Sequence, residues 1–164
     1  MTRRAQLIAE FTHEAKTARR HLARIPDDRF DWRPHGKSST LGKLANHIVD
    51  CLRWVPPVFA SDELDFDATP MLPSTTASSG ELLTLFDAVV ERSLAAIHGS
   101  ADDDASGPWR MRFRGKVRFE KPREVAFRDM ALSHLIHHRG QLSVYLRLLD
   151  IPVPGTYGPT ADEG

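Results

Sequence analysis

The segment SHLIHHRGQ, residues 133–141, places His134 and His138 four residues apart in a stretch whose apolar residues recur at helical spacing. Successive residues of an α-helix are rotated by about 100°, so residues four apart differ by only ~40° around the axis. Both imidazoles are therefore expected on one face of a helix, where they can bind the same ion. The segment predicts a helix and a metal site together.

The helix around this segment is expected to run from Pro122, a favourable first helical residue, to Asp150. It would be the longest helix of the chain. The two histidines fall on its apolar stripe, in positions that otherwise hold core residues: Phe127, Met130, Ala131, His134, His138, Leu142, Tyr145 and Leu149.

Three further segments show the same apolar periodicity. They run from Thr2 to Ile25, from Ser39 or Thr40 to Leu52 ahead of Pro56-Pro57, and from the capping-box sequence Ser78–Glu81 to Gly99. Four amphipathic helices of similar length predict an all-α fold, a four-helix bundle. The alternating residues from Trp109 to Glu120 would form a short irregular or hairpin insert before the last helix. We expect residues 1–164 to form one domain.

The charge and apolar patterns limit the classes of partner. Lys plus Arg and Asp plus Glu number 22 each, so no field of one sign favours nucleic acid or an anionic membrane. The basic run from Arg110 to Arg118 is interpreted as an edge hairpin, with a phosphate or nucleic-acid patch as the alternative. An N-terminal apolar region and a run of ~18 apolar residues are both missing, and the single cysteine, Cys51, fits a reducing compartment. We expect a soluble cytoplasmic protein without nucleic-acid or membrane partners.

A third histidine strengthens the metal hypothesis. His47 shares a helical face with Leu44, Cys51 and Trp54. If its helix neighbours the last one, His47, His134 and His138 form a three-nitrogen site with at least one open position, the arrangement typical of catalytic metal sites. Imidazoles bind zinc, nickel, iron or manganese, and the spacing does not choose among them.

Two nearby residues have competing interpretations. His137 lies about 100° away from His138 around the helix, so we expect it to support the site or pack the helix rather than bind the ion. Cys51 is one turn beyond His47 and is interpreted as a small core residue, with a soft fourth ligand as the alternative. The remaining histidines are expected at the solvated surface: His13, His21, His35 and His98.

These motifs resemble the DinB-like (DinB/YfiT) family of metalloenzymes. The resemblance covers nearly the whole chain and rests on LGKLANHI (41–48), HLIHHRGQL (134–142), YLR (145–147) and the tail VPGTYGPTADE (153–163). It implies a four-helix bundle, often a homodimer, with a divalent metal held by one histidine of the second helix and two of the last. The matching residues here are His47, His134 and His138, and zinc is the first choice of metal. Some relatives use a small thiol such as bacillithiol, mycothiol or glutathione, and the family name refers to induction by DNA damage.

The residues leave the chemistry open between three classes. A thiol-dependent transferase acting on a small electrophile is preferred, because hydrolysis normally needs a general base and the inward stripes offer no evident one. A metal hydrolase and a non-catalytic metal-binding stress protein are the alternatives. Asp162 and Glu163 could supply a base if the tail folded back, but a solvated terminus is the preferred interpretation. No catalytic residue is assigned.

Overall fold

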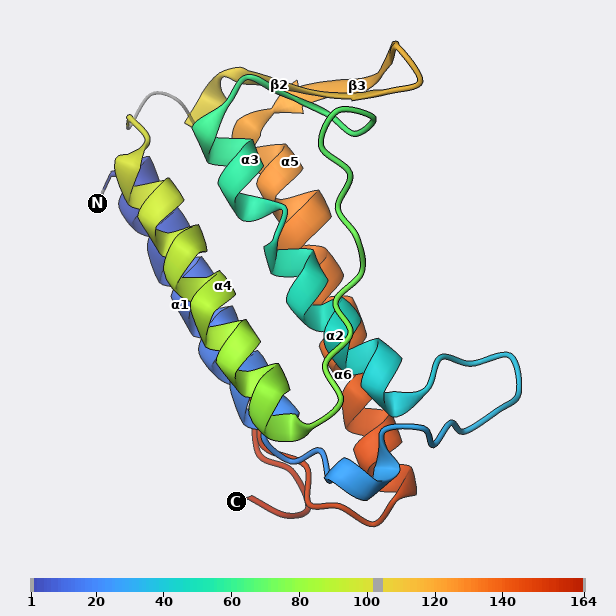
Figure 1. Cartoon of the computed structure of the whole chain (residues 1–164). Helices are drawn as coiled ribbons and strands as arrows, with labels where there is room; N and C mark the ends of the chain where they lie inside the picture. Colours follow the sequence, from blue (N-terminus) through green and yellow to red (C-terminus); the bar gives the residue numbers. More distant parts are fainter. Residues whose placement is uncertain (1, 102–104, 164) are drawn as a thin grey trace.

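Four long helical segments lie side by side in the computed structural model, which describes residues 2–101 and 105–163 (Figure 1). The first and third are α1 (Arg3–Leu22) and α4 (Ser79–Gly99), which pack against each other. The second is α2 (Leu41–Leu52), followed by the short α3 (Val55–Ala60). The fourth comprises α5 (Arg123–Phe127) and α6 (Ser133–Leu148), and α6 packs against α2. The neighbouring helices assumed for the metal site are therefore in contact.

Hydroxyl caps begin three of these helices. Thr2, Thr40 and Ser78 each accept a hydrogen bond from the backbone N–H three residues later, at 3.2 Å. These bonds satisfy main-chain donors that have no partner within the helix. Below the caps, the buried faces meet in one core that includes Phe11, Ile48, Phe86 and Leu142. The predicted helices therefore form where their caps and apolar stripes place them.

The prediction of a purely α-helical fold needs correction, because the mostly helical chain also contains a small sheet. Strands β2 (Pro108–Phe113) and β3 (Lys116–Pro122) form the hairpin predicted before the last helix, turning at Arg114 and Gly115, whose φ angles are 53° and 67°. The short strand β1 (Glu63–Asp65) adds parallel to β2. Three residues are too few for a strand pattern in the sequence, so β1 exists only through its pairing with a distant segment.

The last helical segment is continuous but not uniform. Arg128–Leu132 forms a π-helical turn between α5 and α6. Such a turn accommodates an extra residue and offsets the helix faces on its two sides. The buried line of α6 therefore runs through Leu135, Arg139, Leu142 and Leu146. His134 and His138 lie at the edge of this line, half-buried, and not in core positions as the uninterrupted stripe predicted.

Within residues 2–101 and 105–163, no helix is long and apolar enough to span a membrane.

Candidate metal centre

His47 of α2 and His134 and His138 of α6 converge at the contact between the two helices. The Nε2 atoms of His47 and His134 are 3.2 Å apart. The ring centroid of His47 lies 4.9 Å from that of His134 and 4.5 Å from that of His138, and the two α6 rings are 4.7 Å apart. The structure thus brings together all three histidines singled out from the sequence.

The spacing of these nitrogens fits a divalent ion. With ion–nitrogen distances of about 2.1 Å, two nitrogens 3.2 Å apart would subtend an angle of roughly 100° at the ion, between octahedral and tetrahedral geometry. Among the described residues, only this group offers three or more donor atoms close enough for a metal: His47, Cys51, His134 and His138, all within 4.8 Å of one another. Imidazole nitrogens with one sulfur form a donor set suited to zinc and other transition metals.

In His138 and His134, a hydrogen bond to Nδ1 leaves Nε2 available to bind a metal. Nδ1 of His138 lies 2.8 Å from Oε1 of Gln141, and an amide oxygen can only accept, so Nδ1 carries the proton. His134 hydrogen-bonds the main chain of Met130 in the π-helical turn. Since its Nε2 is turned toward His47, its Nδ1 makes that bond. The rings of His134 and His138 therefore hold the tautomer in which Nε2 can act as a metal ligand.

Burial and mutual proximity keep the imidazoles neutral. Partial burial is the main cause that lowers the pKa of His47, His134 and His138, although His47 is the most exposed of the three, and a neighbouring imidazole lowers each pKa further. Neutral imidazole is the form that binds a metal. The site is thus poised for an ion near neutral pH.

The sulfur of Cys51 lies within 4.8 Å of the donor nitrogens of the three histidines, and the residue is buried, 1 % exposed. Burial raises the pKa of its thiol to about 12. The metal-free thiol is therefore protonated and inert at neutral pH. Its place one turn beyond His47 satisfies both interpretations made from the sequence, a core residue and a fourth donor.

Two cavities open beside His47. The larger, about 500 Å³, is lined in part by His138, Gln141, Ser39 and Tyr145. The smaller, about 200 Å³, has apolar walls that include Trp54, Phe66 and Leu72. The Trp54 and Phe66 rings stack with centroids 5.8 Å apart, and Leu72 is 72 % exposed. Two cavities of mixed lining thus meet at His47, and the larger one has the greater share of polar groups.

Asp50 is the carboxylate that borders the smaller cavity, and it is fully engaged. It accepts hydrogen bonds from Arg53 Nη1 at 3.1 Å and from the Ser74 hydroxyl at 2.6 Å, besides the Ser74 N–H. These partners fix Asp50 in a structural role and leave it poorly placed as a general base. The sequence did not single out this residue.

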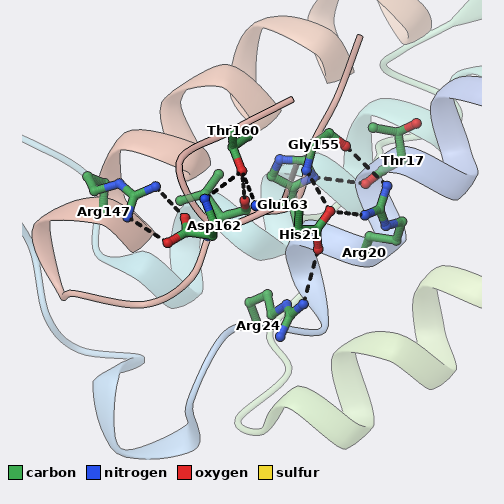
Figure 2. Close-up of polar contacts among 10 residues, drawn as sticks. Thr17, Arg20, His21, Arg24, Arg147, Gly155, Thr160, Asp162 and Glu163 are labelled. Carbon is green, nitrogen blue, oxygen red and sulfur yellow. Dashed lines mark hydrogen bonds and ion pairs between the residues drawn. The ribbon is translucent and has the colours of Figure 1, made fainter. Parts of the chain in front are cut away.

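The two carboxylates of the C-terminal tail keep contact with solvent, as expected, but they are held by arginines of the helices (Figure 2). Asp162 pairs with Arg147 of α6. Glu163 pairs with Arg20 in the last turn of α1 and with Arg24 just after this helix. Arg147 lies nine residues beyond His138, roughly 13 Å along the helix. Neither carboxylate is therefore positioned to act at the centre.

His21 is a correction to the expected surface histidines. It is fully buried, with Nδ1 2.9 Å from the Thr17 carbonyl oxygen and Nε2 3.5 Å from the Thr156 hydroxyl of the tail. His137 is not a member of the metal group, as expected. Its Nε2 lies 3.0 Å from Nε2 of Gln141.

The sequence model of the DinB family matches residues 1–164. A crystal structure of a DinB-like protein from Bacillus subtilis superposes with a TM-score of 0.71 at 17 % identity, covering 97 % of this chain and 99 % of the other. One from Bacillus cereus ATCC 10987 gives a TM-score of 0.67 at 22 % identity, covering 89 % and 92 %. A comparison with curated proteins gave no match.

Proposed function

The chain belongs to the DinB family, and from this premise we propose that it is a divalent-metal-dependent enzyme that transfers a small thiol to a small electrophile. His47, His134 and His138 are the proposed ligands, and zinc is the proposed metal, with nickel, iron or manganese as alternatives. We also propose, on the family resemblance, one domain acting as a cytoplasmic homodimer. Sedimentation of the purified protein tests the dimer.

One observation carries the proposal: three neutral imidazoles from two helices meet where two cavities open. A closed structural zinc site normally has four protein ligands, whereas three histidines leave a position for substrate. A bound divalent ion supplies Lewis-acid chemistry, since it favours the deprotonated form of a thiol or a water that reaches it.

The walls of the two cavities support a reaction with two substrates. Ser39, Gln141 and Tyr145 offer polar groups around the larger cavity, which suits the polar body of a thiol cosubstrate. The stacked Trp54 and Phe66 rings and the exposed Leu72 suit an uncharged apolar electrophile in the smaller one. His47 borders both cavities, so the two reactants would meet at the ion.

The carboxylates of the region favour thiol transfer over hydrolysis. Asp50 is held by Arg53 and Ser74, and the tail carboxylates Asp162 and Glu163 are paired elsewhere. A thiol needs no separate base once an ion stabilises its thiolate, whereas hydrolysis of an ester or amide normally uses one.

The first experiment is elemental analysis of protein purified without a His-tag, wild type beside His134→Ala. Near-stoichiometric metal that is lost in the variant would support the ligand set. The loaded wild type is then incubated with an electrophile such as 1-chloro-2,4-dinitrobenzene, with and without glutathione, bacillithiol or mycothiol. Turnover that requires a thiol supports transfer, and turnover of esters without a thiol would replace it with hydrolysis. Wild type that stays metal-free after reconstitution with each ion would refute the proposal.

A second candidate follows from Cys51. Its sulfur lies within 4.8 Å of the three nitrogens. Coordination by Cys51 would complete a four-ligand set and favour a non-catalytic site that stiffens the bundle. The cobalt(II) form separates the two cases, because a thiolate ligand adds an intense near-ultraviolet charge-transfer band that an all-imidazole site lacks.

A further inference from the structure

Gln141 connects two histidines on the exposed side of α6. Its Oε1 lies 2.8 Å from Nδ1 of His138, and its Nε2 lies 3.0 Å from Nε2 of His137. We propose that Gln141, oriented by His137, is a positioning residue that fixes the His138 tautomer so that Nε2 faces the ion. This inference rests on the proposed metal site, and it assigns a role to His137, which is not a member of the ligand group.

The chemistry of the amide gives the connection a direction. An amide can present either its oxygen or its NH₂ group to a neighbour. If the NH₂ group faced His138, Nδ1 would accept, the ring proton would sit on Nε2, and that nitrogen could not bind a metal. With its oxygen toward His138, Gln141 requires the proton on Nδ1 and frees Nε2.

His137 provides the second hydrogen bond of the Gln141 amide. In the orientation that the structure shows, the Gln141 NH₂ group can only donate, so Nε2 of His137 accepts from it, and this second bond holds the amide with its oxygen toward His138. The two partners lie three and four residues from Gln141, the spacings at which helical side chains meet. The ring of His137 also packs edge-on against that of His138, with centroids 4.8 Å apart.

The two proposed ligands on α6 are supported in different ways. His134 is anchored by the main chain of Met130, a partner that no side-chain substitution removes. His138 depends on an exposed side chain, which also lines the larger cavity. Groups that hold the outer nitrogen of a metal-binding histidine typically change metal affinity by 10–100-fold when they are removed. Substitution of Gln141 should therefore lower the metal affinity far more than is usual for an exposed side chain.

The test compares Gln141→Leu, which removes both hydrogen bonds, with Gln141→Glu, which retains an acceptor for His138. Zinc affinity is measured by competition with a chromophoric chelator, and the cobalt(II) form by its visible spectrum. We expect about a 10–100-fold loss of affinity and an altered spectrum for Gln141→Leu. Gln141→Glu should bind within a few fold of wild type, and His137→Ala should show a smaller loss than Gln141→Leu. Val144→Ala is the matched control, because Val144 is exposed and lines the same cavity without touching either ring nitrogen.

A second measurement does not depend on metal. Long-range ¹⁵N–¹H correlation spectra of the metal-free protein report which nitrogen of His138 is protonated at a pH where the ring is neutral. Wild type and Gln141→Glu should show the proton on Nδ1, and Gln141→Leu should shift it toward Nε2. This shift would support the positioning role even if no metal bound and the proposed function failed. An unchanged tautomer in Gln141→Leu, or wild-type zinc affinity in that variant, would overturn the inference.

Discussion

Arg139 follows His138 in the sequence but points into the core, where its Nη1 donates to Oε2 of Glu14 at 2.6 Å. The hydroxyl of Tyr157 in the tail lies 2.7 Å from the same guanidinium. The adjacent side chain of His138 consequently faces outward toward α2 and the cavities, since neighbouring residues of a helix differ by about 100°. The buried Arg139–Glu14 ion pair therefore helps to fix the rotation of α6 about its axis. This rotation directs His134 and His138 toward α2.

Breaking this ion pair should be costly. The side chains of Arg139 and Glu14 are 3 % and 9 % exposed, so Arg139→Met leaves a buried carboxylate without its cation. We expect a loss of about 3–5 kcal/mol in the free energy of unfolding, measured by urea denaturation of metal-free protein. Arg19→Met is the control, because the Arg19–Asp87 pair is about half-exposed and should contribute less than about 1 kcal/mol. Equal losses in the two variants would contradict the buried role.

Each of the three ligands should be required for metal binding. His47→Ala, His134→Ala and His138→Ala should each purify with little metal, because two imidazoles hold an ion weakly. His137→Ala should keep most of it. His35→Ala changes a loop histidine that is not a member of the group, so it should match wild type in metal per chain by elemental analysis. A full complement of metal in His47→Ala would show that His47, and with it α2, supplies no ligand to the site.

Cys51 should not be needed for stoichiometric metal. Because three imidazoles already converge, Cys51→Ala should retain one ion per chain, and wild-type cobalt(II) protein should show no thiolate charge-transfer band. A strong near-ultraviolet band that disappears in Cys51→Ala would instead identify a fourth ligand and favour the closed site.

Core packing on α6 should be separable from the site. Leu142 is fully buried, so Leu142→Ala should cost about 2–5 kcal/mol of stability through the cavity it leaves. Leu148, 57 % exposed on the same helix, should change stability by less than about 0.5 kcal/mol when replaced by Ala. Both variants should bind metal as wild type does. Loss of metal from Leu142→Ala at a temperature where this variant is folded would show that metal binding requires the packing of Leu142.

His21 should make stability depend on pH. Burial is the main cause that lowers its pKa below the ordinary value of 6.5, and Arg139 and Arg20 act in the same direction, opposed by the Thr17 carbonyl and Glu163. The unfolded chain therefore binds more protons than the folded one just below pH 6.5. The stability that neutral His21 contributes to the folded state is fully present above pH 6.5 and is lost as the pH falls toward the pKa that His21 has in the folded protein. The free energy of unfolding measured with a chelator present should fall less steeply over this range in His21→Gln than in wild type.

The sequence predicted the local features well because their causes are local. The capping hydroxyls of Thr40 and Ser78 and the apolar periodicity around them identify helices without knowledge of neighbours. The spacing of His134 and His138 places both rings on one face whatever the tertiary structure. Strand β1, in contrast, has no local signal, because it forms by pairing with β2 far along the chain.

The sequence by itself determined the helices, their apolar faces and the pairing of His134 with His138, since each follows from the geometry of a single helix. The tertiary structure decided that α2 lies against α6, which brings Nε2 of His47 to 3.2 Å from Nε2 of His134. It also decided that the π-helical turn moves the histidines to the edge of the core, and that Arg139 and the tail carboxylates are held elsewhere. The helix contact and the ion pairs depend on segments distant in the chain, and the π-helical turn departs from the regular spacing that periodicity assumes.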